Sequence, residues 1–191
     1  MNTPPAEPRK ANRGPQAAAA NRRALIAAAR VVFGGGGYNA PLSSVAKLAG
    51  VGQGSLYRHF PDRLSLAVAV FDENIGELEA IAERPDGTLD QLFDVIVEQA
   101  LASSTMIDMI DAAPGDERVR HLDKRVEELV SRLLQRERAA GRLGRSLDVE
   151  DVMLSISMLA GVVARTSAER RSAVACRARA LIQTAFVHEA T

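Results

Sequence analysis

Residues 40–60 read APLSSVAKLAGVGQGSLYRHF, a stretch that predicts two short helices joined by a tight turn. Pro41 suits the first position of a helix, because its φ is already helical and its missing N–H needs no partner there. Apolar residues follow at helical spacing, and Gly50 is expected to end this first helix in a left-handed conformation. Gly52 is then the expected N-cap of a second helix over residues 53–59.

The second helix of this pair combines a narrow apolar stripe with varied polar groups. Leu56 and Phe60 lie four residues apart and are expected to face inward. The other positions carry an amide, a hydroxyl, a phenol, a guanidinium and an imidazole, on Gln53, Ser55, Tyr57, Arg58 and His59. Packing alone explains this surface poorly, whereas it fits a recognition helix in a DNA major groove. A helical hairpin with a solvated polar face is the alternative.

The charges of the chain are unevenly distributed. The 191 residues carry 24 basic and 24 acidic side chains, so the net charge is zero. Residues 1–63 contain nine Lys or Arg and two acids, a net charge of +7, and the rest of the chain carries −7. A basic end on an acidic body suits a protein of which only one end approaches a polyanion.

The periodicity of apolar residues predicts an all-α fold. The first helix is expected from about Ala17 or Asn21 to Phe33, where a run of four glycines ends it. Asp62 is expected as the cap or as a first-turn acid of a helix of about twenty residues that links the basic end to the body. The expected domains are a disordered basic tail at residues 1–16, a three-helix helix-turn-helix DNA-binding domain at 17–63, and a larger helical ligand-binding and dimerisation domain at 64–191.

Residues 46–63, AKLAGVGQGSLYRHFPDR, resemble the DNA-binding signature of the TetR/AcrR family of bacterial transcriptional regulators. The resemblance extends over about residues 21–71, and the remainder matches only in its helical architecture. It implies a homodimeric repressor that is released from a palindromic double-stranded DNA operator by a small ligand. It also implies that the long helix after Asp62 swings the DNA-binding end when the ligand binds. Ala40 departs from the family pattern, which commonly has a Thr or Ser cap there.

The predicted DNA contacts fall into two classes. Tyr57, His59 and Arg63 are expected to contact phosphates, and Arg63 stands where the family usually has a lysine that does so. The candidates for contacts with base edges are Gln53, Ser55 and Arg58, since Gln prefers adenine and Arg prefers guanine. Gly54 lets the backbone approach a phosphate closely, and Ser43 and Ser44 are further candidates for phosphate contacts.

The candidate ligand contacts lie in the body. Methionine side chains are flexible and polarisable, so Met106 and Met109 suit an adaptable cavity for a small apolar or amphipathic ligand. They suit an irregular core equally well. His121 is a candidate for a hydrogen bond to the ligand, although a solvent-facing histidine is the more common case. Met153 completes the set of candidates.

The last two predicted helices, about residues 148–166 and 169–187, are apolar around much of their circumference. A helix with two apolar sides needs two partners, and the second is expected to be the same helix pair of another chain. The alternative is a monomer in which both helices are internal.

Several other classes of protein find no support in the sequence. The single Cys176 excludes an internal disulfide, which is consistent with a reducing cytoplasm. No apolar run is long enough for a membrane span, and no catalytic motif, metal-ligand spacing or cofactor motif is found. We therefore expect a cytoplasmic regulator that is not an enzyme. A ligand-independent activator and a helical adaptor without specific DNA binding remain as alternatives.

Overall fold

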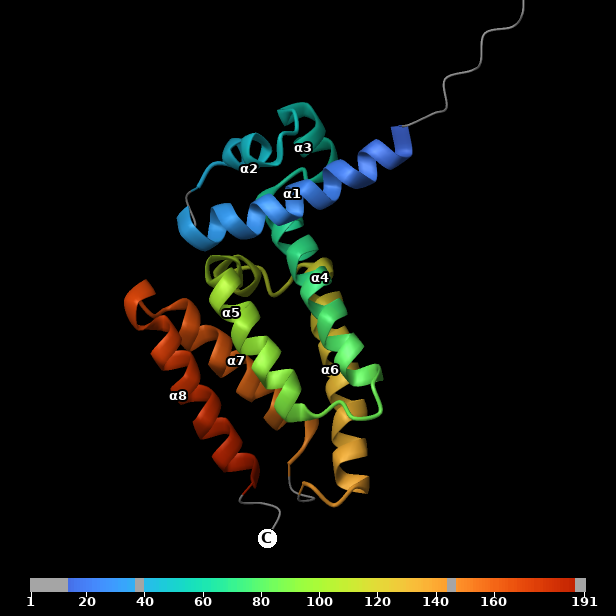
Figure 1. Cartoon of the computed structure of the whole chain (residues 1–191), viewed down its shortest axis with the longest axis vertical. Helices are drawn as coiled ribbons and strands as arrows, with labels where there is room; N and C mark the ends of the chain where they lie inside the picture. The colour runs from blue at the N-terminus through green and yellow to red at the C-terminus, as the bar shows by residue number, and fades with distance from the viewer. Residues whose placement is uncertain (1–13, 37–39, 144–146, 188–191) are drawn as a thin grey trace, which may run out of the picture.

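The computed structural model describes residues 14–36, 40–143 and 147–187. Within these ranges the chain forms eight helices and no strand, which confirms the all-α prediction. A small head of three helices sits on a larger body of five (Figure 1). The helices are α1 (Gly14–Gly36), α2 (Leu42–Ala49), α3 (Gln53–His59), α4 (Arg63–Glu83), α5 (Leu89–Asp111), α6 (Glu117–Ala139), α7 (Val149–Ala164) and α8 (Ala168–Val187).

Helix α1 is longer than the sequence predicts at both ends. It begins at Gly14, within the segment expected to be a tail, and residues 1–13 lie outside the described residues. It also continues through Gly34 to Gly36, so the predicted end at Phe33 was wrong. A Cβ atom on Gly34 would stand 3.1 Å from the carbonyl oxygen of Ala102 in α5. The close approach of α5 explains how tertiary packing maintains a helix that glycine alone disfavours.

The helix-turn-helix matches its prediction closely. Gly50 ends α2 with a φ of 65°, Gly52 is the N-cap of α3, and α3 runs from Gln53 to His59 as expected. The start of α2 differs by one residue, because Pro41 is its N-cap rather than its first helical residue. Within the described part of the chain no side chain caps α2, and Pro41 at the N-cap position supplies no hydroxyl of the kind that the family pattern provides.

The head core extends beyond the three helices of the head. Its buried apolar cluster combines side chains of α1, α2 and α3 with Leu66, Ala67, Ala69 and Val70 from the first half of α4. Met106 and Met109 of α5 complete the cluster, exposed by 0% and 5%. Packing thus continues from the head into the body, past the domain boundary expected after residue 63.

Helix α4 joins the two parts as one continuous element (Figure 1). Asp62 and Ser65 form a capping box at its start, in which the Ser65 N–H donates to Asp62 Oδ1 at 2.5 Å. Its second half, including Ile75 and Leu78, belongs to the body core. The predicted link of about twenty residues is confirmed by a helix of 21 residues.

Helix α5 bends at Ser103. Ser103 has φ −125° and ψ 21°, after which the helix resumes and continues to Asp111. Ser103 and Ser104 are both buried, and their hydroxyls have no hydrogen-bond partner in the described part of the chain. The helix is therefore kinked at this pair of serines and does not end there, and the segment beyond the kink carries Met106 and Met109 into the head core.

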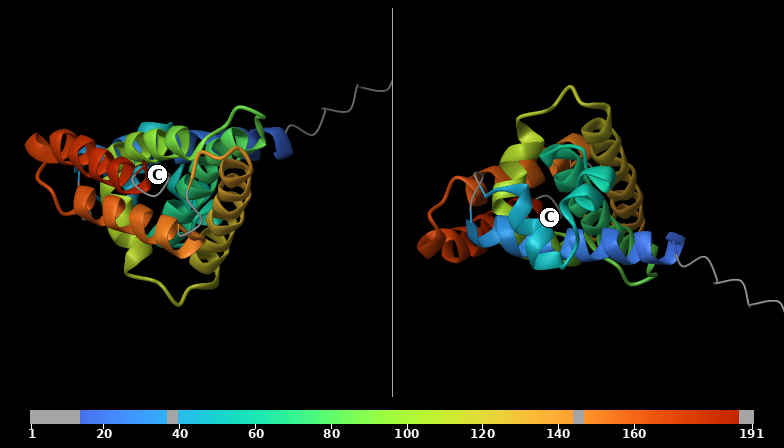
Figure 2. Two further views of the ribbon diagram at one scale, coloured as in Figure 1. Left: turned by 90° about the horizontal axis from the view of Figure 1, so that it is seen from below. Right: turned by 90° about the horizontal axis from the view of Figure 1, so that it is seen from above.

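The body has α6 on one flank and α8 on the opposite flank, with α5 packed against α7 between them (Figures 1 and 2). Arg125 ties α6 to α4, because its guanidinium bonds both Glu79, at 2.9 Å, and Asp72, at 2.5 Å. No helix among the described residues combines the length and apolar character needed to span a bilayer.

Candidate nucleic-acid interface and ligand cavity

Helix α3 lies at the end of the head that faces away from the body (Figure 1). Leu56 and Phe60 hold it to the head core and are only 1% and 2% exposed, as their spacing predicts. Burial of these two side chains leaves the remainder of the helix surface on the outside of the head.

The polar side chains of α3 lie at or near the surface of the head. Tyr57 is 51% exposed, Gln53 and Arg58 are exposed, and Ser55 and His59 are half-buried. None of these five side chains makes a hydrogen bond or an ion pair with another described residue. Five different hydrogen-bonding groups on one short helix are thus available to an external partner.

The remaining predicted DNA contacts surround α3. Ser43 is exposed and Ser44 half-buried in the first turn of α2, while Gly54 has open space on the side where a Cβ atom would be. The Arg63 guanidinium lies over the Phe33 ring, 5.9 Å from its centroid. Arg22 takes a similar position over Phe60, at 5.5 Å. These contacts hold two cations at the surface of the head.

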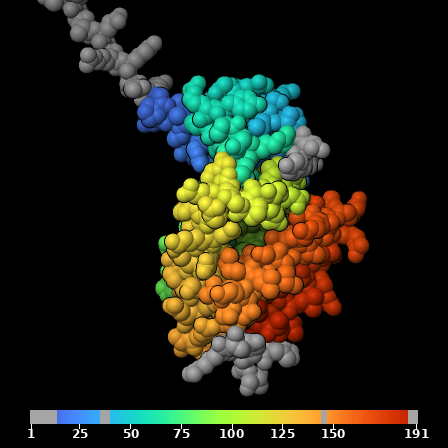
Figure 3. Space-filling view, turned by 180° about the vertical axis from the view of Figure 1, so that it is seen from behind, coloured from blue at the N-terminus to red at the C-terminus, as the bar shows by residue number. Residues whose placement is uncertain are grey.

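A cavity of about 200 Å³ lies in the body between α4, α5, α6 and α7. From behind, a hollow is visible between α6 in yellow and α7 in orange, below the head (Figure 3). Its walls are mostly apolar. The lining side chains are Phe71, Asn74, Ile75, Leu78, Ile96, Gln99, Ala100, Ile107, Ile110, Asp111, Leu122, Asp123, Val126, Ile156, Ser157 and Ala160.

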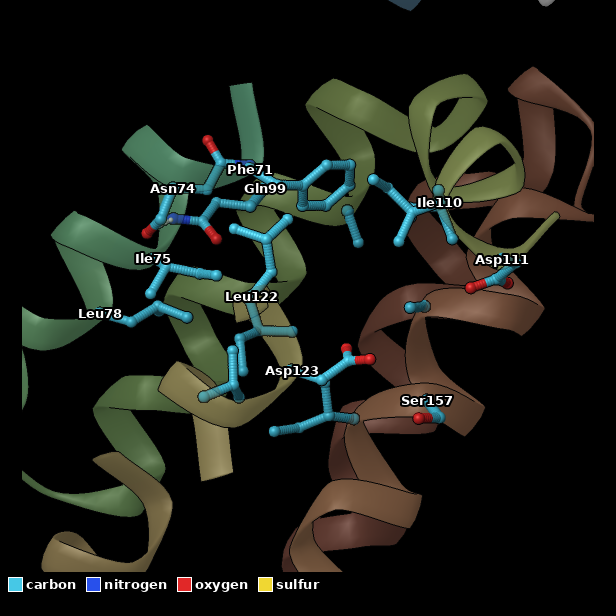
Figure 4. A pocket seen from close by; sticks show the side chains of 16 residues that line it. Phe71, Asn74, Ile75, Leu78, Gln99, Ile110, Asp111, Leu122, Asp123 and Ser157 are labelled. Carbon is cyan, nitrogen blue, oxygen red and sulfur yellow. Dashed lines mark hydrogen bonds between the residues drawn. The ribbon is translucent and has the colours of Figure 1, made fainter. Parts of the chain in front are cut away.

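Polar groups occupy two separate parts of this cavity (Figure 4). Asn74 is 1% exposed, and its Oδ1 accepts a hydrogen bond from Arg30 of α1, whereas its Nδ2 has no partner among the described residues. Asp111 and Asp123 lie on the side away from Asn74. Desolvation raises the pKa of both carboxyl groups, and the charge of Asp111 raises the pKa of Asp123 further.

None of the four predicted ligand contacts lines the cavity. Met106 and Met109 are buried in the head core, His121 is exposed, and Met153 is partly buried against the body core. Sequence reasoning missed Asn74 and Asp123, although both interrupt apolar patterns, between Phe71 and Ile75 and beside Leu122. A polar residue within an apolar stripe could have indicated a residue that lines the cavity.

Helix α7 separates the cavity from an exposed apolar face. Ile156, Ser157 and Ala160 line the cavity. Leu154, Met158 and Val162 point outward and are 59%, 63% and 39% exposed, and Leu181 of α8 is 59% exposed. Monomeric proteins rarely leave such large apolar side chains clustered in solvent.

Comparisons with known proteins agree with this architecture. The family model of bacterial regulatory proteins of the tetR family matches residues 25–70, the segment that contains the helix-turn-helix and the start of α4. No curated protein sequence matches the chain.

Solved structures share the fold over most of the chain. A TetR transcriptional regulator from Streptomyces coelicolor is 26% identical, with a TM-score of 0.64, and the match covers 87% of this chain and 98% of that one. A TetR regulator from Mycobacterium vanbaalenii is 24% identical, with a TM-score of 0.59, over 78% and 96%. The head therefore carries the DNA-binding helix-turn-helix of the tetR family, and the chain as a whole has the fold of TetR transcriptional regulators.

Proposed function

We propose that the protein is a homodimeric repressor that binds a palindromic operator and leaves it when a small ligand enters the body cavity. Two observations together carry this proposal. The polar side chains of α3 have no hydrogen-bond or ion-pair partner among the described residues, and α4 forms both a wall of the cavity and part of the head core. A displacement of α4 by a ligand is thereby transmitted to the DNA-binding surface.

The roles of the head residues follow from their chemistry and position. Gln53, Ser55 and Arg58 read base edges, while Tyr57, His59 and Arg63 contact phosphates on either side of the groove. Ser43, Ser44 and the backbone at Gly54 add phosphate contacts. Gln53, Tyr57 and Arg58 are exposed and have no hydrogen-bond or ion-pair partner among the described residues, which supports this assignment.

Dimerisation occurs through α7 and α8. Leu154, Met158 and Val162 recur every four residues, so they form one stripe along α7, and Leu181 adds to the apolar surface from α8. Pairing these helices with their copies about a two-fold axis buries the stripe and forms a four-helix interface. The two α3 helices are then related by the symmetry that a palindromic site requires.

The experiment that tests the DNA-binding proposal is a selection of the purified protein against random duplex DNA at near-physiological salt, followed by sequencing of the retained fragments. We expect an inverted repeat, because two equivalent α3 helices read two equivalent half-sites. Retention that is weak, strongly salt-sensitive and independent of sequence would instead support a helical adaptor.

A reporter experiment tests the sign of regulation. The selected site is placed between a constitutive promoter and a reporter gene, where a bound dimer blocks transcription. We expect lower expression with the wild-type protein and full expression with an Arg58→Ala variant. Unchanged expression despite occupancy of the site would exclude the repressor mechanism, and increased expression would identify an activator.

A further inference from the structure

The middle of the body cavity is apolar. Phe71 and Ile75 of α4 and Leu122 of α6 face it, together with Ile110 of α5 (Figure 4). A ligand that fills this space gains free energy in proportion to the apolar area that it removes from water. The central portion of the ligand is therefore hydrocarbon or aromatic.

One end of the cavity presents two acids and a hydroxyl. Asp111 at the end of α5, Asp123 of α6 and Ser157 of α7 come from three different helices and all line the cavity. None of their side chains has a hydrogen bond or an ion pair within the described residues. The field of Arg165 reaches Asp111, but Arg165 makes no ion pair with it.

Among the described residues, no cation forms an ion pair with the acids at this end of the cavity. The two carboxyl groups are close enough for the charge of Asp111 to disfavour ionisation of Asp123. A cation between them would relieve this repulsion and part of the cost of desolvation. An ammonium group has three donors, which match two carboxylates and one hydroxyl.

The other end of the cavity presents a donor. Asn74 is almost completely buried, and Arg30 occupies its Oδ1, which fixes the orientation of the amide. Its Nδ2 then lacks an acceptor among the described residues. A buried donor without a partner is costly, and an acceptor on a ligand would satisfy it.

We propose that the cavity binds an amphipathic cation, in which an apolar body joins an amine held by Asp111, Asp123 and Ser157 to a hydrogen-bond acceptor opposite Asn74. This proposal rests on the proposed ligand-binding role of the cavity and adds the chemical class of the ligand. An amphipathic cation is thereby preferred over an uncharged or an acidic lipid-like molecule of equal size.

The test compares three probes that share one hydrocarbon chain: octylamine, octanol and octanoate. Their dissociation constants are measured by calorimetry with the full-length protein at neutral pH. We expect octylamine to bind most tightly and octanoate most weakly. In an Asp111→Asn/Asp123→Asn double variant, the affinity for octylamine should fall by about fivefold to tenfold, while that for octanol stays equal or rises.

Two further variants locate the binding. Glu98→Gln removes an exposed acid of α5 that does not line the cavity, so it should leave the affinity for octylamine unchanged. Ser157→Phe places a ring at the acidic end, so it should abolish binding of octylamine. Both substitutions are at exposed positions, and circular dichroism of each variant verifies that the helices persist.

A fourth probe tests the proposed hydrogen bond from Asn74 to an acceptor on the ligand. It is an amino-octanol with the amine at one end of the chain and the hydroxyl at the other. We expect it to bind at least as tightly as octylamine, because Asn74 compensates the loss of hydration of the hydroxyl. In an Asn74→Asp variant, which keeps an oxygen towards Arg30 but lacks the donor, that hydroxyl should weaken binding. An amino-octanol that binds far more weakly than octylamine to the wild type would refute the role of Asn74.

The outcomes distinguish the ligand class from the ligand-binding role. If octanol or octanoate binds as tightly as octylamine and Ser157→Phe blocks both, the cavity binds ligands but the cationic class is wrong. If no probe binds, or if Ser157→Phe leaves binding intact, the proposed ligand-binding role of this cavity fails as well.

Discussion

Arg30 of α1 donates a hydrogen bond from Nη1 to Oδ1 of Asn74 in α4, and its Nη2 lies 3.4 Å from Oε2 of Glu73. A guanidinium of the head thus holds two consecutive residues at the point where α4 becomes the wall of the cavity. Asn74 is the only residue that both lines the cavity and accepts a hydrogen bond from α1 among the described residues. A ligand that contacts Asn74 therefore acts directly on a contact with the head.

We predict that Arg30→Met weakens the coupling between ligand and DNA. The ratio of operator dissociation constants with and without saturating octylamine should move towards one, because Asn74 no longer connects to α1. Fluorescence anisotropy with labelled operator DNA measures both constants. Arg23→Met is the matched control, since Arg23 is exposed on the same helix and makes no hydrogen bond or ion pair with another described residue. It should lower DNA affinity and leave the ratio unchanged.

Substitutions on the head should separate affinity from specificity. Tyr57→Phe and Arg63→Ala should weaken binding to selected and random duplexes alike, because phosphates are the same in every sequence. Arg58→Ala and Gln53→Ala should cost about 1–3 kcal/mol on the selected site and little on random DNA. Competition titrations with both duplexes measure the two quantities. Equal losses on both duplexes from all four variants would contradict this division of roles.

Met158→Glu should convert the dimer to a monomer. The substitution introduces a charge at the centre of the α7 stripe, where the copy of the helix would place another by symmetry. Light scattering after size exclusion measures the mass, and binding to the inverted repeat should fall with it. Leu48→Glu is the control, because Leu48 is 54% exposed on α2 in the head and should leave the dimer intact.

Asp116 gives a prediction on pH and stability. Hydrogen bonds from Arg118 lower the pKa of the Asp116 carboxyl to about 2. Because the unfolded value is about 3.9, this interaction stabilises the fold fully above about pH 4 and is lost as the pH falls towards about 2. As the pH is lowered from about 4 to about 2, the urea concentration at the midpoint of unfolding should therefore fall less in an Asp116→Asn variant than in the wild type. Glu98 is exposed and forms no ion pair with another described residue, so Glu98→Gln should keep the wild-type slope.

Local signals in the sequence were sufficient to predict the helix-turn-helix. Gly50 and Gly52 determine the turn through backbone conformation, and the spacing of Leu56 and Phe60 fixes the buried side of α3. These are short-range constraints, so the structure adds little to them. Asp62 likewise forms a capping box at the start of α4, where the sequence predicts a helix start.

Contacts between distant segments decide the features that the sequence did not predict. The helix persists through Gly34 because α5 packs against it, and Ser103 bends α5 without ending it. Met106 packs in the head core because α5 bends before it. His121 is exposed because of the orientation of α6 about its own axis. Periodicity identifies an apolar face but not the element that covers it.

The head core depends on Met106 and Met109 of α5, which lie about fifty residues further along the chain than the end of α3. A fragment that stops at the end of α4 would lose both side chains and leave a gap under α1. A fusion protein that joins this DNA-binding head to another domain therefore needs the last turns of α5, or other side chains that fill the same space. The DNA-binding head of this protein is therefore not an independent unit, because its core includes two methionines of the body helix α5.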